Sequence, residues 1–179
     1  WTSYQQDISG RSNTAYTTFD DTVFAYGSSK TGGILIIDIK EHTAKIQTTS
    51  GPEPSPSITD AALVKFDSFL MFIGGKASSQ STLIYALNLD SFRWFIFHIF
   101  PDGSTVSAID GIINDLGLFM LPRIHSVGAI YEEKNREIIA FLGYPLSEPS
   151  KLFILSVGEA LSLLHLRSDM LQTLQYEDN

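Results

Sequence analysis

Residues 54–97 decide the fold and read PSPSITDAALVKFDSFLMFIGGKASSQSTLIYALNLDSFRWFIF. Four short runs rich in Ile, Leu, Phe and Tyr follow one another here, separated by small and polar residues. Runs of this length between turn-forming residues are typical of β-strands. The run at 69–75 (FLMFIGG) is almost continuously apolar, which predicts a strand buried on both faces. The stretch therefore predicts four consecutive strands.

The same pattern is present on both sides of this stretch. Similar runs cover residues 22–27 and 33–40 before it, and residues 127–131, 138–143 and 151–157 after it. Short polar residues that tolerate tight turns separate the first two runs each time, at Asp20-Asp21, Asp67-Ser68 and Lys134-Asn135. Helical spacing is scarcely visible before the last twenty or so residues. The chain is therefore predicted to be all-β.

The runs repeat with a period in the high forties. The residue 47 positions before Trp94 is Gln47, and the residue 46 positions before that is Trp1. We expect Gln47, or its neighbour Ile46, and Trp1 to occupy the position of Trp94 in the preceding units. The corresponding run after Trp94 is LLHL at 163–166, displaced by an insertion. Four strands per unit at this period predict β-propeller blades.

We therefore expect residues 1–179 to form one partial, incomplete propeller domain, with about three full blades plus the last strand of a preceding one. The expected parts are that last strand (1–9), a blade (13–50), the best-matching blade (56–100), an insertion loop (101–121), a blade (122–167), and a tail or the start of a next element (168–179).

Several residues resemble the Kelch repeat, whose propeller is similar to the central propeller of galactose oxidase. They are the double glycine Gly74-Gly75, the third strand at 83–90, Trp94 about twenty residues after the glycines, and Pro122, Arg123 and His125 at the start of the next unit, which keeps the single Gly143. The resemblance implies a structural role in the blades for Gly74, Gly75, Trp94 and Gly143. It also implies a non-catalytic protein–protein interaction module that scaffolds or recruits substrates. Another kind of propeller or a β-sandwich stays open.

Composition excludes several kinds of chemistry. There is no cysteine, so disulfides, thiolate zinc sites and cysteine nucleophiles are excluded. The four histidines are isolated, and no nucleophile elbow, phosphate loop or metal motif occurs. We therefore expect no enzyme activity, cofactor or metal. The alternative is a fragment of a propeller enzyme whose catalytic residues lie outside this chain.

The net charge of −8 disfavours nucleic acid and acidic membranes as partners. We expect protein partners instead, and the rest of the propeller to come from the same or another chain. The absence of cysteine, of a glycosylation acceptor and of a signal or transmembrane segment favours a cytoplasmic location. The candidate interaction residues are Arg123 and His125, together with Ile109, Ile112 and Ile113 of the insertion, because long loops on a rigid scaffold often carry function.

Overall fold

The computed structural model describes residues 11–77, 83–97, 112–113, 119–120, 125–144 and 152–157. All regular secondary structure in these residues is β-strand, which confirms the predicted all-β class. Within the same part of the chain there is no helix that could cross a membrane.

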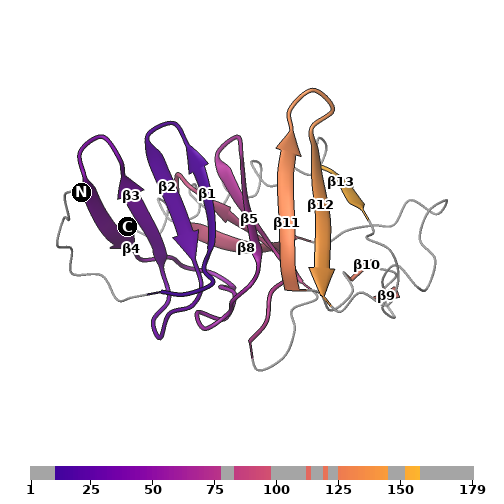
Figure 1. Cartoon of the computed structure of the whole chain (residues 1–179), viewed down its shortest axis with the longest axis horizontal. Helices are drawn as coiled ribbons and strands as arrows, with labels where there is room; N and C mark the ends of the chain where they lie inside the picture. Colours follow the sequence, from indigo (N-terminus) through magenta and orange to yellow (C-terminus); the bar gives the residue numbers. More distant parts are fainter. Residues whose placement is uncertain are drawn as a thin grey trace, which may run out of the picture.

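Three antiparallel sheets follow one another along the chain (Figure 1). The first sheet has the order β1 (Ala15–Phe19), β2 (Thr22–Tyr26), β3 (Ile34–Asp38) and β4 (Thr43–Gln47). The second repeats this order with β5 (Ala62–Phe66), β6 (Phe69–Ile73), β7 (Ile84–Asn88) and β8 (Arg93–Phe97). The third contains β11 (His125–Glu132), β12 (Glu137–Tyr144) and β13 (Phe153–Ser156). Each sheet is thus a simple up-and-down meander.

The three predicted hairpin turns join β1 to β2, β5 to β6 and β11 to β12, as expected. The insertion was predicted as a loop, but it contains a short ladder between β9 (Ile112–Ile113) and β10 (Phe119–Met120). The expected strand at 1–9, the fourth strand of the last blade at 163–166 and the tail at 168–179 lie outside the described residues.

The second sheet is sandwiched between the other two, and β6 shows this most clearly. All five of its residues are completely buried, which confirms the prediction from its apolar run. Leu70 and Phe72 pack in a core shared with the first sheet, whereas Phe69, Met71 and Ile73 pack in a core shared with the third. Successive side chains of a strand point to opposite faces, so one apolar strand serves both interfaces.

We call the face of a sheet that is turned toward the next sheet in the chain its forward face, and the opposite face its backward face. The first core is formed by forward-face residues of the first sheet, such as Tyr26 and Ile34, and backward-face residues of the second, such as Leu87 and Trp94. The second core joins the forward face of the second sheet to Val127, Ile138 and other backward-face residues of the third. In both interfaces, therefore, the forward face of one sheet packs on the backward face of the next sheet in the chain.

The first strands of successive sheets approach one another: β5 lies beside β1 on one side and beside β11 on the other. Figure 1 shows these three strands as neighbours, with β4 and β13 toward opposite ends of the row. The sheets are thus stacked in chain order with their first strands adjacent.

The strand register corrects the predicted tryptophan equivalence. Trp94 pairs with Leu87 on β7, and the matching position in the first sheet is Ala44, which pairs with Ile37 on β3. Gln47 and Ile46 therefore do not occupy the tryptophan position. The cause is loop length, because the connection at 74–83 is three residues longer than its counterpart at 27–33. The first two strands of the second sheet lie 47 residues after their counterparts in the first sheet, whereas the last two lie 50 residues after theirs.

Candidate interaction surface

The two ends of the sheet stack differ in their connections. Tight turns between strands, such as residues 20–21, 67–68 and 133–136, lie at one end, which is uppermost in Figure 1. We call this the hairpin end. At the opposite end, the long-loop end, lie the strand ends from which the other connections leave and to which they return, namely those at 27–33, 48–61, 74–83, 98–124 and 145–152. Long loops that leave a rigid scaffold commonly carry binding function.

Two of these connections, at 27–33 and 48–61, are joined by backbone hydrogen bonds. The Ser28 amide donates to the carbonyl of Ile58 at 2.7 Å, and the Ser29 amide donates to the carbonyl of Pro56 at 2.9 Å. The connector between the first two sheets, residues 48–61 with Pro52, Pro54 and Pro56, therefore lies against the loop that follows β2. This pairing fixes part of the long-loop end without any regular strand.

Side-chain hydrogen bonds of Tyr26 and Glu53 also join these two connections. The Tyr26 hydroxyl lies 3.0 Å from Glu53 Oε1 and 2.5 Å from the carbonyl oxygen of Pro54. Glu53 Oε1 also accepts the amide of Gly33 at 2.8 Å. Burial raises the pKa of Tyr26 well above its ordinary value, and the neighbouring Glu53 carboxylate raises it further. The phenol therefore stays protonated, and its proton is available to these two acceptors.

The four structural positions named from the sequence lie in or next to the sheets. Trp94 is completely buried between the first and second sheets, where its ring meets Tyr26 edge-on at 5.0 Å between centroids. Gly74 and Gly75 follow β6 with φ of 69° and 100°, and Gly143 in β12 has φ of 124°. A Cβ on Gly75 would lie 2.8 Å from the Ala61 Cβ, so the strand can leave the sheet here only without a side chain.

The candidate interaction residues are only partly within the described chain. Ile112 and Ile113 form β9, and His125 begins β11 with its Nδ1 3.2 Å from the Ser126 hydroxyl. Figure 1 places β9 and β10 toward the long-loop end, the end at which β11 begins. Arg123 and Ile109 lie outside the described residues.

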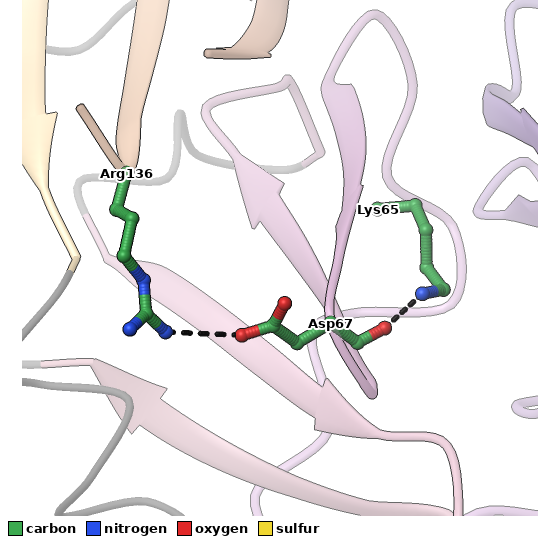
Figure 2. Close-up of polar contacts among 3 residues, drawn as sticks. All are labelled: Lys65, Asp67 and Arg136. Atoms are coloured by element: carbon green, nitrogen blue, oxygen red, sulfur yellow. Dashed lines mark hydrogen bonds and ion pairs between the residues drawn. The ribbon is translucent and has the colours of Figure 1, made fainter. Parts of the chain in front are cut away.

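The hairpin end carries polar contacts between sheets that sequence reasoning missed (Figure 2). Arg136, in the turn after β11, donates to the Asp67 carboxylate in the turn after β5 at 3.1 Å. Lys65 donates to the Asp67 carbonyl and lies over the ring of Phe19 in the first sheet, 4.2 Å from its centroid. Burial lowers the pKa of Lys65. Both partners of the ion pair are about half exposed, so the pair contributes at most about 1 kcal/mol.

No cluster of potential metal ligands is formed by the residues that the structure describes. His98 and His165, which the sequence assigns to apolar runs, lie outside them. No protein-family model matches the chain, and a search of curated proteins finds no match.

Proposed function

We propose that this chain is a non-catalytic protein-interaction module, part of a Kelch-like β-propeller, that binds a protein partner at its long-loop end. The observation that carries the proposal is the difference between the two ends of the stack. Tight hairpins close one end, while the strands joined by the long connections begin or end at the other, where β9 and β10 also lie. The strands at which these connections start and finish belong to a buried scaffold.

The propeller part of the proposal is supported by the repeated meander and by the adjacent first strands. In a propeller, four-stranded sheets are arranged radially around a central channel, so their first strands approach one another along the channel. The contacts of β5 with β1 and with β11 are consistent with such an arrangement. Gly74, Gly75 and Trp94 then serve packing rather than recognition, as the Kelch resemblance implies.

Deleting residues 102–114, which removes β9, tests the proposed contact. The deletion is expected to reduce captured partner protein by at least about tenfold, a loss of about 1.4 kcal/mol in binding free energy. Quantitative mass spectrometry of pull-downs with the whole chain and with the deletion variant measures this loss.

A matched control changes the opposite end. The double variant Asp67→Asn, Arg136→Ala removes an exposed ion pair at the hairpin end and should leave capture unchanged. Circular dichroism and the melting temperature establish that both variants are folded. Equal capture by the deletion variant and the whole chain would show that the insertion is not the contact.

A further inference from the structure

Among the described residues, no sheet packs on the forward face of the third sheet, and this face carries a row of apolar side chains. Its side chains include Ile130, Ile154 and the preceding Leu152, which are 53%, 60% and 65% exposed. Ile139 and Phe141 lie on the same face and are partly exposed. The Phe141 ring lies across β11, because a Cβ on Gly128 would be 2.7 Å from it. The face therefore presents an apolar row over β11, β12 and β13, with Glu132, Glu137 and Ser156 beside it at the hairpin end.

Strand register shows that the same row of positions is covered in the second sheet. Val64, Met71 and Ala86 form one row across β5, β6 and β7, two residues from the hairpin pair Phe66–Phe69. All three are buried in the core shared with the third sheet.

In the third sheet, Ile130, Ile139 and Ile154 form the row at the same distance from the hairpin pair Glu132–Glu137. This exposed row is thus the counterpart, by register, of a row in the second sheet that the third sheet buries. A further sheet placed by the same rule would have its first strand beside β11.

The other half of this repeated interface is present in the same chain. On the backward face of the first sheet, Tyr16 and Ile46 are 69% and 40% exposed, and Val23 and Ile37 are half-buried. Ala25 and Leu35, between Tyr16 and Ile46 in the same row, are buried. The corresponding backward faces of the second and third sheets are the ones that pack on a preceding sheet.

A side-chain pair near the hairpin end recurs at both existing interfaces. Phe19 meets Lys65 at the first, and Phe66 meets Tyr131 at the second, with ring centroids 5.7 Å apart. At a third interface built in the same way, these two positions would be occupied by Glu132 of the third sheet and Thr18 on the backward face of a first sheet. A threonine hydroxyl can donate to a carboxylate, so this pair is chemically compatible.

We infer that the forward face of the third sheet binds the backward face of the first sheet of a second copy of this chain, head to tail. The inference rests on the repeated interface and not on the proposed binding at the long-loop end. A contact between two different faces leaves one of each free, so it builds a ring if the rotation closes and a filament if it does not.

Two single variants test this contact. Ile154→Lys places a charge on the forward face, and Tyr16→Lys places one on the backward face; both positions are exposed, so both variants should fold. Light scattering coupled to gel filtration should show assemblies of two or more copies for the unmodified chain and monomers of 19.8 kDa for each variant alone.

Mixing the two variants gives the decisive result. Each variant retains the face that the other lacks, so an equimolar mixture should form a dimer with one contact and go no further. The double variant, with both faces altered, should stay monomeric and serves as the control.

Three results would overturn the inference: a monomeric unmodified chain, a mixture that stays monomeric, or a Tyr16→Lys variant that still dimerises through two forward faces. Loss of partner capture on deleting residues 102–114 is independent of all three, so this proposal and the proposed function can fail separately.

Discussion

Replacing Trp94 by alanine is expected to lower the free energy of unfolding by about 3–5 kcal/mol, because the change leaves a cavity at a fully packed interface. Trp94 is completely buried between the first and second sheets and contacts the rings of Tyr26 and Phe72. Within the described part of the chain its indole Nε1 has no hydrogen-bond partner, so the expected loss is argued from packing. Urea denaturation followed by fluorescence or circular dichroism measures it.

Ile39→Ala is the matched control for this substitution. Ile39 is 48% exposed beyond the end of β3, so its truncation should change the stability by no more than about 0.5 kcal/mol. If the two variants lost similar amounts, Trp94 would not lie in a core between two sheets.

Gly27→Ala is expected to destabilise the chain by about 3 kcal/mol, through backbone strain and a direct clash. Gly27 has φ of 96°, which side-chain-bearing residues rarely adopt. A Cβ there would lie 2.4 Å from the carbonyl oxygen of Ile58, and that oxygen belongs to backbone that Ser28 already holds by a hydrogen bond. Thermal or urea unfolding gives the change.

Ser57→Ala, at an exposed position in the same connector, is the control and should be neutral within about 0.5 kcal/mol. A loss below about 1 kcal/mol for Gly27→Ala would mean that the loop after β2 does not pack on the connector at Ile58.

The strands were predictable because their signal is local. The run at 69–75 indicated a strand buried on both faces, and β6 is completely buried. Short polar pairs such as Asp67-Ser68 indicated the hairpins that join the first two strands of each sheet. Apolar periodicity and turn residues act over a few positions, so the sequence carries them directly.

Which residues occupy matching positions in successive sheets was less predictable, because the match depends on the lengths of the loops between the strands. Matching Trp94 to Gln47 assumed one constant step, but the longer connection before β7 shifts the match to Ala44. The ladder of β9 and β10 was missed for a related reason, since each strand has only two residues and so carries no periodic pattern.

Contacts between sheets could not be predicted, because their partners are distant in the sequence. Arg136 and Asp67 are 69 residues apart, and Tyr26 and Glu53 are 27 apart. Arg136 and Asp67 meet only once successive sheets are stacked, and Glu53 meets Tyr26 only once the connector packs on the first sheet. Nothing in the local sequence marks Glu53 or Arg136 as a partner. The exposed isoleucine row of the third sheet likewise follows from stacking order rather than from composition.

A double-mutant cycle between Tyr26 and Trp94 tests the stacking of successive sheets most directly. Their rings belong to different sheets and lie 5.0 Å apart, so the variants Tyr26→Leu, Trp94→Leu and their combination should show a coupling energy of about 0.5–1.5 kcal/mol. A second cycle between Phe66 and Tyr131 applies the same test to the second and third sheets. Coupling at both pairs is the predicted result, and strictly additive losses at both pairs would contradict the stacked arrangement.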